Sequence, residues 1–434
     1  MSPLLLGALG LGAVFALILL QVPIGFSMMI VGVVGVALQS SWAPALTLLA
    51  NEPAGVLSNV DLATVPLFLL MGTFATIAGF SADIYNAVAA LFGHRRGGLA
   101  YATIGGCAGF GVVCGSSTAT AATFGRVALP EMRRRGYAPA FSTGVIAAGG
   151  TLKSLIPPSI VMILYCIVGK TFIFDLFLAA VVPALLAIAL NLVAITLIVR
   201  FRPEVAPVLE KASWEEKKRA LVKAAPVLIL IAGVFGGLYS GIFTVNEAAS
   251  VAAVLSFLFA LVRGRLTWSN LVLGLRESAS ATAMLYVILM GAFVFGYFIT
   301  LARIPEALVG AIEGLPLPPL AIVFLLLIGY LILGAVFDEI SAMLITLPFV
   351  LPVIVKLGYD PVWWGVINVV VIELGMIIPP IGVIVFLLHG LARDIPIRTI
   401  YRGVTPFIFA DLVLLSLLAI FPALSMWLPR ALGS

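Results

Sequence analysis

The sequence predicts an all-α polytopic membrane protein with an inverted-topology repeat, in which each half carries a re-entrant helical hairpin and a broken helix. Three observations lead to this fold class. Hydrophobic residues make up 62% of the chain, a block of motifs occurs twice at a constant spacing, and the charge of the flanking loops reverses between the two copies. Inverted repeats with broken helices are common among secondary transporters, so a transport function is favoured.

The composition indicates that most of the chain lies in lipid. Only 10% of the 434 residues are charged, and a soluble protein with this balance would expose large apolar patches. Since a spanning helix needs about 20 apolar residues, roughly ten to twelve spans are expected. The three cysteines form no ligand-like cluster, so no zinc or other transition-metal site is expected. The net charge of +5 comes mainly from short loops, which is typical of cytoplasmic loops rather than of nucleic-acid binding.

A block of motifs in the first half recurs in the second. The matched pairs are Leu129-Pro130 with Leu351-Pro352, Gly136-Tyr137 with Gly358-Tyr359, and Pro157-Pro158 with Pro379-Pro380. The matched prolines are separated by 222 positions in each case (352−130 and 379−157). This constant offset predicts two homologous halves.

The charged residues beside these motifs differ between the copies. In the first copy the Gly-Tyr loop carries three arginines at 133–135, whereas its counterpart balances Lys356 with Asp360. After the Pro-Pro step the bias reverses, because residues 169–175 are neutral while residues 393–402 carry three arginines. Since positive loops stay on the cytoplasmic side, the matched loops are predicted to lie on opposite sides of the membrane.

These patterns divide the chain into three segments. Residues 1–199 and 226–434 form the two inverted repeats, and residues 200–225 form a polar cytoplasmic connector between them. Within the connector, Ser213 and Glu216 have the spacing of a capping box that opens an amphipathic helix. We expect this helix to lie along the membrane interface, either as a passive linker or as a docking site for a partner. The N-terminus is then expected on the periplasmic side.

Each Pro-Pro pair lies within an apolar stretch, where it removes amide donors and interrupts a helix. The first break, near 149–159, combines small and hydroxyl residues with the prolines. The second, near 373–382, follows Glu373 and is rich in glycine. Irregular backbone at this depth persists only beside protein or a hydrated cavity, where its carbonyls can bind a cation such as sodium. A single Pro-Pro step is most simply a kink, but two at matching positions favour a binding site.

A second polar interruption precedes each Gly-Tyr loop. The first, at 115–120, contains Ser116, Ser117, Thr118 and Thr120; the second, at 338–342, contains Asp338, Glu339 and Ser341. Small polar residues suit the tip of a re-entrant hairpin, although they also serve in ordinary helix packing. Two adjacent carboxylates between apolar runs indicate a functional site unless they lie in a water-exposed turn.

Two further readings concern single side chains. Lys153 lies on the first broken helix, where its charge would either attract a carboxylate substrate or neutralise a carboxylate of the protein. Ser116 and Ser117 also raise the possibility of an intramembrane enzyme. Neither of the two histidines occupies a position from which it would activate them, so we expect no enzymatic activity.

The motifs together resemble the large membrane subunit of TRAP transporters, the DctM-like family, over essentially the whole chain. Four stretches carry the resemblance: Gly241-Ile242-Phe243-Thr244 with Glu247-Ala248-Ala249, Ala148-Gly149-Gly150-Thr151 with Ile156-Pro157-Pro158-Ser159, Asp338 with its downstream Leu-Pro and Gly-Tyr-Asp-Pro blocks, and Glu373-Leu374-Gly375 with Pro379-Pro380 and Gly382.

The resemblance implies sodium-coupled uptake of an organic acid, usually a carboxylate, across the bacterial or archaeal inner membrane. It implies no cofactor other than sodium ions, and it implies two partners, a small four-helix membrane subunit (DctQ-like) and a periplasmic binding protein (DctP-like). It also implies an elevator mechanism, in which a transport domain moves against a scaffold. The sodium and substrate groups that it implies are Ser116, Ser117, Thr118, Thr120, Gly149, Gly150, Thr151, Pro157, Pro158, Ser159, Asp338, Glu339, Ser341, Gly375, Met376, Pro379, Pro380 and Gly382.

Two departures from the family pattern lie beside the second break. Family members often have Thr where this chain has Ile378, and Asn where it has Ile384. Both changes remove polar side chains, so backbone carbonyls become the expected ligands there. The alternative function is a sodium- or proton-coupled carboxylate or ion transporter of the same hairpin architecture that works without a binding protein.

Overall fold

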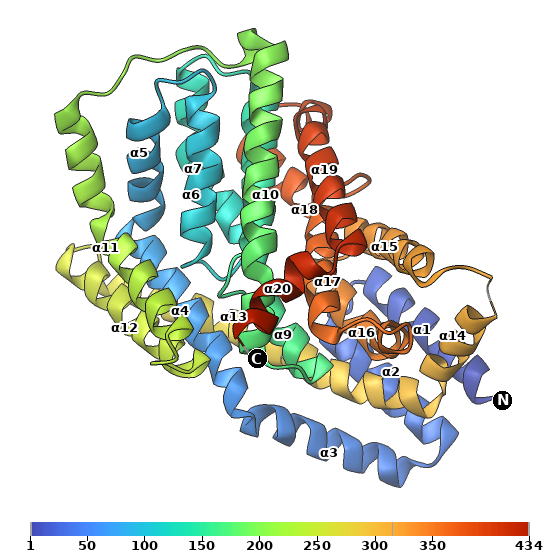
Figure 1. Cartoon of the computed structure of the whole chain (residues 1–434). Coiled ribbons are helices and arrows are strands. Elements are labelled where there is room, and N and C mark those ends of the chain that lie inside the picture. The colour runs from blue at the N-terminus through green and yellow to red at the C-terminus, as the bar shows by residue number, and fades with distance from the viewer. Residues whose placement is uncertain (1, 315, 433–434) are drawn as a thin grey trace.

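The computed structural model describes residues 2–314 and 316–432. Within these ranges the chain forms twenty α-helices and two short 3-10 helices, and no strand occurs. Figure 1 shows the N-terminus at the right edge of the view and the C-terminus near the centre, where helices from both halves meet. The fold is therefore all-α, as the composition predicts.

The first helices of the chain are α1 (Pro3–Leu19), α2 (Ile24–Gln39), α3 (Trp42–Ser58), the 3-10 helix η1 (Val60–Ala63) and α4 (Thr64–Ala78). The Asn59 side chain caps η1 by accepting a hydrogen bond from the Asp61 amide. Gly79 ends α4 in the left-handed conformation, which glycine adopts without steric penalty. Short polar or glycine-containing steps thus separate long apolar helices.

The rest of the first half contains α5 (Phe80–Phe92), α6 (Gly98–Gly111), α7 (Ser117–Arg134), α8 (Pro139–Leu155), α9 (Ile160–Gly169) and α10 (Ile173–Phe201). Helices α6 and α7 pack against each other and both pack on α8, so they form a hairpin beside the first break. Helices α8 and α9 are bent by 40° at that break, which lies at the predicted Pro157-Pro158 step.

The connector contains the 3-10 helix η2 (Pro203–Val205) and leads into α11 (Trp214–Tyr239). The predicted capping box is confirmed, because Ser213 Oγ accepts from the Glu216 amide and Glu216 accepts from the Ser213 amide. The expected interfacial helix is not a separate element, however. Its residues form the first turns of α11, because neither glycine nor a capping residue separates them from the apolar run that follows.

The second half contains α12 (Val245–Val262), α13 (Trp268–Leu301), α14 (Ile304–Glu313), α15 (Pro319–Val336), α16 (Glu339–Lys356), α17 (Pro361–Gly375), α18 (Val383–Leu391), α19 (Ile397–Ile420) and α20 (Ala423–Leu432). Helices α15 and α16 pack on α17, and α17 is separated from α18 by the second Pro-Pro step. In Figure 1, α10 and α19, which are in contact, stand beside each other near the centre of the view.

The helix contacts of the two halves correspond. Helix α2 packs along α13 and α12 packs along α4; α7 contacts α18 and α16 contacts α9. The hairpin helices α7 and α16 begin at Ser117 and Glu339, which are again 222 residues apart (339−117). These pairings agree with two related halves, while their inverted orientation in a membrane stays a prediction.

The described residues contain eight helices long and apolar enough to cross a membrane, or up to nine if the bent pair α8–α9 counts as one span. This is fewer than the roughly ten to twelve spans expected from the total apolar length at about 20 residues each. The difference arises because part of the apolar sequence forms shorter helices, among them α1, α2, α5 and α17.

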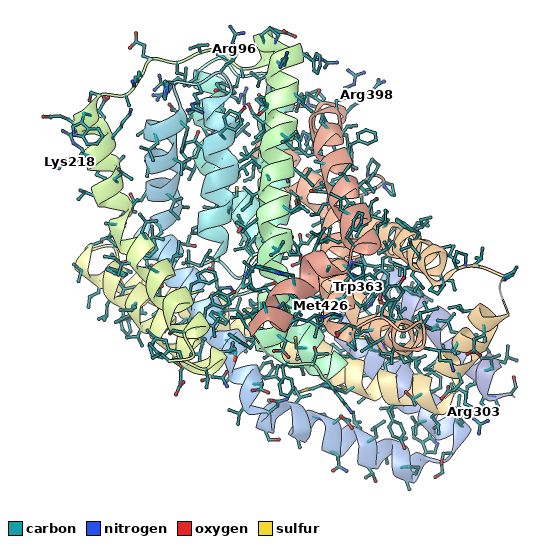
Figure 2. All side chains as sticks on the ribbon, in the orientation of Figure 1. Arg96, Lys218, Arg303, Trp363, Arg398 and Met426 are labelled. Carbon is teal, nitrogen blue, oxygen red and sulfur yellow. The ribbon has the colours of Figure 1, made fainter. Side chains whose placement is uncertain are left out.

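The charged side chains are distributed unevenly along the molecule. Figure 2 shows Arg96, Lys218 and Arg398 at the upper end of the view, whereas Arg303 lies at the lower right. At the surface, Arg133 also forms an ion pair with Asp394 over 2.6 Å, which joins two of the loops predicted to share one side of the membrane. Loops from both halves therefore bring basic residues to the same end of the protein.

Candidate functional site

The two predicted hairpin tips both form the starts of helices. Ser116 is the N-cap of α7, with its Oγ accepting from the Ala119 amide, and Asp338 is the N-cap of α16, with Oδ1 accepting from the Ser341 amide. The Ser341 hydroxyl also donates to Asp338 Oδ2. Ser116 and Asp338 are 222 residues apart (338−116), so the two halves use equivalent positions to satisfy the free amides of a helix N-terminus.

Behind the tips lies a group of buried polar side chains in an otherwise apolar interior. It consists of Ser117, Lys153, Ser154, Glu339 and Glu373, which we call the buried polar cluster. The exposed fractions of Lys153, Glu373 and Glu339 are 0%, 3% and 9%. Five helix ends contribute to this region, because α6, α7, α8, α16 and α17 all start or finish beside it. Buried ionisable groups at such a crossing are a functional hypothesis by default.

Hydrogen bonds link the cluster across the two halves. Ser117 Oγ donates to Glu373 Oε1 over 2.8 Å, and the hydroxyls of Ser117 and Ser154 are 2.7 Å apart. Ser117 has a single hydroxyl proton, so Ser154 must be the donor in the second bond. The order is therefore Ser154 to Ser117 to Glu373. Ser117 is also the first residue of α7, where the helix dipole favours a nearby negative charge.

The two glutamates of the cluster face each other. Both side chains belong to the same buried cluster, and Glu339 Oε2 and Glu373 Oε2 have no hydrogen-bond partner among the described residues. Each carboxyl group therefore keeps one buried oxygen that is available as an acceptor.

Lys153 supplies the positive charge of the cluster. Its Nζ donates to the carbonyl oxygen of Pro158 over 3.3 Å, and it interacts electrostatically with Glu339 and Glu373. Of the two readings from the sequence, this arrangement fits neutralisation of the protein's own carboxylates. An unpaired buried charge would be strongly destabilising, so the lysine and the glutamates depend on one another.

The prolines of the two breaks are cis at Pro157-Pro158 and Pro379-Pro380. In the first break the Pro158 carbonyl accepts from Lys153. In the second, the Tyr401 hydroxyl lies within hydrogen-bonding distance of the Pro380 and Ile381 carbonyls, at 3.1 and 2.6 Å. Each break thus satisfies part of its freed backbone with a side chain from the protein.

The other predicted site residues outside the cluster form local hydrogen bonds or are buried beside the breaks. Thr118 shares a 2.8 Å hydrogen bond with Ser116, and Thr120 donates to the Ser116 carbonyl. Ser159 is fully buried, and its Oγ has no partner among the described residues. Thr151 donates to the Ala148 carbonyl, and Met376 is buried beside the second break.

Four predicted glycines occupy positions where the backbone approaches its neighbours. A Cβ at Gly149 would lie 2.6 Å from Cys107 Sγ, and one at Gly150 would lie 2.8 Å from Ala121 Cβ. A Cβ at Gly375 would lie 2.6 Å from the Gly334 backbone, and Gly382 has a φ of +57°. Gly149, Gly150 and Gly375 therefore allow the broken helices to approach α6, α7 and α15 closely, while Gly382 supplies a left-handed backbone conformation after the second break.

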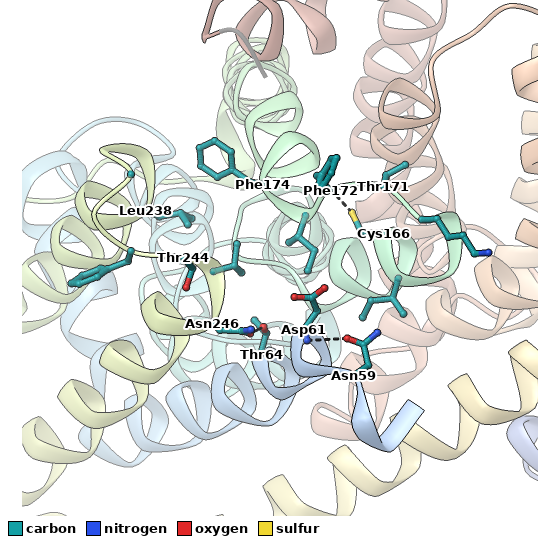
Figure 3. Close-up of a pocket in the computed structure, with 16 residues that line it drawn as sticks. Asn59, Asp61, Thr64, Cys166, Thr171, Phe172, Phe174, Leu238, Thr244 and Asn246 are labelled. Carbon is teal, nitrogen blue, oxygen red and sulfur yellow. Dashed lines mark hydrogen bonds between the residues drawn. The ribbon is translucent and has the colours of Figure 1, made fainter. Parts of the chain in front are cut away.

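Two cavities open beside the hairpin and the first break. The smaller, of about 280 Å³, lies among α4, α7 and α13 and is lined by Ser116, Arg126 and Glu277 among others. The larger, of about 600 Å³, is enclosed by η1, the α9–α10 loop and the start of α12. Figure 3 shows its polar side chains, with Asp61 and Asn59 below and Thr244 and Asn246 at the side. The Thr64 hydroxyl donates to Asn246 Oδ1 at its edge.

A further small cavity of about 20 Å³ lies between α8, α10, α17 and α19. Thr151, Glu373 and the buried Asp411 are among its lining residues. The space is about that of one water molecule. Glu373 therefore lies between this cavity and the rest of the buried polar cluster.

The sequence did not assign Glu373, Ser154 or Asp411 to the site, and it left the role of Lys153 open. For Glu373 and Ser154 a signal existed, because each stands 222 residues from a predicted site residue: Glu373 after Thr151 (373−151) and Ser154 before Met376 (376−154). Asp411 has no comparable signal, since its neighbours come from distant segments. The predicted residues that meet in the cluster are Ser117 and Glu339, which are themselves equivalent at the same offset (339−117).

Comparison with known proteins agrees with this architecture. Residues 11–424 match the family model of the tripartite ATP-independent periplasmic transporter, DctM component. The chain is 36% identical over 400 residues to the C4-dicarboxylate TRAP transporter large permease protein DctM of Pseudomonas aeruginosa, covering 90% of this chain and 93% of that protein. It is 31% identical over 421 residues to the sialic acid TRAP transporter large permease protein SiaM of Vibrio cholerae, covering 97% and 96%.

A third relative is named as a transporter of a different class of solute. The ectoine/5-hydroxyectoine TRAP transporter large permease protein UehC of Ruegeria pomeroyi is 31% identical over 431 residues, covering 96% of this chain and 97% of that protein. Among solved structures, the YdaH transporter of Alcanivorax borkumensis has a TM-score of 0.61 at 17% identity, covering 89% and 90%. At that identity the likeness concerns the fold alone.

The family match covers nearly the whole chain, and the curated relatives share its length and are named as permeases rather than enzymes. The chain is accordingly a multi-pass membrane protein that belongs to the DctM family, the large permease subunits of TRAP transporters.

Proposed function

We propose that this chain is the large subunit of a sodium-coupled importer that takes up an organic acid, a carboxylate, across the inner membrane. The observation that carries the proposal is the buried polar cluster, in which Ser117 of one half bonds to Glu373 of the other. Such a crossing of hairpin tips and interrupted helices is where secondary transporters bind their substrates and coupling ions. The proposal extends to a periplasmic binding protein that delivers the substrate and a small membrane subunit that completes the complex.

The cavity at the first hairpin tip suits an anionic substrate. Arg126 lines it together with Ser116, and among the described residues the guanidinium makes no hydrogen bond or ion pair. A free guanidinium matches the geometry of a carboxylate. We assign the substrate carboxylate to this cavity and the coupling cation to the polar groups of the tips and breaks, including Asp338 and Ser341.

The proposal also identifies the helices that would move during transport. Helices α6–α9 and α15–α18 carry both hairpins and both breaks, and the cavities lie between this group and the helices α4, α12 and α13. A rigid displacement of the first group against the second would expose the site to alternate sides, as an elevator does. In this arrangement the hairpins are re-entrant, the N-terminus is periplasmic and the connector is cytoplasmic.

Reconstitution tests the proposal. The chain is inserted into liposomes with the membrane subunit and binding protein encoded beside it, and uptake of a radiolabelled organic acid is followed under an inward sodium gradient. We expect uptake that needs both the gradient and the binding protein. Equal uptake in potassium would defeat sodium coupling, and uptake without the binding protein would favour the independent carboxylate transporter instead.

A further inference from the structure

Lys153 lies at a helix C-terminus, a position where the backbone favours a positive charge. It lies in the last turn of α8, where the negative end of the helix dipole and the free carbonyls favour positive charge. Its Nζ donates to the Pro158 carbonyl over 3.3 Å, within the break that follows. Half-helix C-termini and unwound carbonyls are also the groups that coordinate sodium in broken-helix transporters.

The surroundings hold the side chain in this position. The whole residue is inaccessible to solvent, and its stem packs so closely on α6 that a Cβ at Gly111 would lie 3.2 Å from Lys153 Cγ. The titratable groups that face its charge are Cys114 from the first hairpin tip, Glu339 from α16 and Glu373 from α17. The ammonium is therefore fixed by its packing and by the Pro158 carbonyl, and the two buried glutamates supply negative charge in the same cluster.

The second half lacks this feature. The position equivalent to Lys153 is Gly375 (153+222), which has no side chain and packs against the Gly334 backbone. The side-chain donor to the second break is the neutral Tyr401 hydroxyl, which lies 3.1 Å from the Pro380 carbonyl. The two equivalent positions, Lys153 and Gly375, therefore differ by one positive charge.

We propose that the Lys153 ammonium is a tethered cation that occupies the first-half cation position, so that a free coupling ion binds only in the second half. The inference rests on the proposed sodium coupling and deepens it. Lysine and sodium both carry one positive charge, and both are satisfied by carbonyl and carboxylate oxygens. The tethered charge moves with the protein and is not released, so it reduces the number of sodium ions transported in each cycle.

Replacement of the lysine by the residue of the other half tests this. The full-length protein and its K153G variant are purified, and bound ²²Na⁺ is counted per chain at saturating sodium. Thermal unfolding is followed in sodium chloride and in choline chloride of equal ionic strength. We expect K153G to bind one more sodium ion per chain than the unmodified protein and to be stabilised more strongly by sodium. An unchanged sodium count would overturn the proposal.

A further variant guards against unspecific effects. K211G removes an exposed lysine of the connector and should leave the sodium count unchanged. A gain of sodium in K211G would contradict the charge argument. If K153G unfolds, restoration by sodium but not by choline supports the proposal, whereas equal instability in both salts refutes it.

The outcome is separable from that of the proposed function. Sodium-independent uptake by the unmodified protein would remove the coupling proposed above. Acquisition of a sodium site by K153G would still identify Lys153 as the group that replaces the ion, because the measurement concerns binding and not transport.

Discussion

Ser117 and Glu373 lie 256 residues apart in the sequence, yet the Ser117 hydroxyl donates a 2.8 Å hydrogen bond to the Glu373 carboxylate in the interior of the protein. Ser117 opens α7 in the first hairpin, and Glu373 lies in the last turn of α17 before the second break. The bond therefore joins the hairpin of one half to the broken helix of the other. Any movement of one relative to the other would have to break it.

Removal of this donor should weaken both stability and transport. In S117A the Glu373 carboxylate loses its donor while it stays buried, which costs about 1–3 kcal/mol for an unsatisfied polar group. We expect a lower unfolding midpoint and strongly reduced uptake, measured by thermal unfolding in detergent and by proteoliposome assay. T47A, at an exposed hydroxyl of α3 that bonds only within its own helix, is the control. A variant S117A that behaves like T47A would show that the bond is dispensable.

The parts of the site that could be predicted are those that local sequence determines. Adjacent prolines remove two neighbouring amide donors, and Ser and Asp are preferred helix caps by residue type. The breaks after α8 and α17 and the starts of α7 and α16 therefore lie at the predicted Pro-Pro steps and polar interruptions, whereas single prolines such as Pro130 and Pro352 lie inside helices. The contacts of Glu373 with Ser117 could not be found in this way. They depend on how helices from opposite ends of the chain cross, and the offset of 222 relates equivalent positions without stating which of them touch.

For Lys153, too, the sequence predicted the position of the residue but not its contacts. Its depth within an apolar helix was evident from the sequence, and its partners were not. The choice between a substrate-binding lysine and a neutralising lysine required the position of Glu339, which comes from the second hairpin. The connector helix was expected to end before the apolar span. It instead continues through the change of polarity, and through Pro226, as the single helix α11 (Trp214–Tyr239).

The close approach of Gly334 and Gly375 should be essential for the second hairpin. In G375A the new methyl group would lie 2.6 Å from the Gly334 backbone, so α15 would have to move, and overpacking of this kind costs about 1–3 kcal/mol. We expect a lower unfolding midpoint and impaired uptake. G329A lies in α15 where a Cβ meets no atom within 4 Å and should be neutral or slightly stabilising. Equal effects of the two changes would contradict the packing role.

Arg126 should determine the affinity for the substrate under the proposed function. Loss of one charge-assisted carboxylate interaction is worth about 1.5–3 kcal/mol, so R126Q should raise the half-saturating substrate concentration by about tenfold or more. R126K keeps the charge without the planar donor pair, so its half-saturating concentration should lie between those of the unmodified protein and R126Q. The measurement is initial uptake at graded substrate concentrations, with expression checked by immunoblot. Unchanged half-saturation in R126Q would show that the carboxylate binds elsewhere.

The Arg133–Asp394 pair should make a small contribution to stability that depends on pH. The two residues connect the end of α7 with the loop after α18, and the hydrogen bond from Arg133 lowers the pKa of the Asp394 carboxyl below its usual range. The stabilisation is therefore fully present above the ordinary aspartate pKa of about 4 and is lost as the pH falls through the lowered value. The unfolding midpoint of D394N should lie slightly below that of the unmodified protein at pH 7, and the two should converge in strongly acidic buffer. Choline chloride should shrink the difference at pH 7 by screening, because both side chains are exposed. A difference that persists unchanged in acid would have to arise from packing of the loop and not from the ion pair.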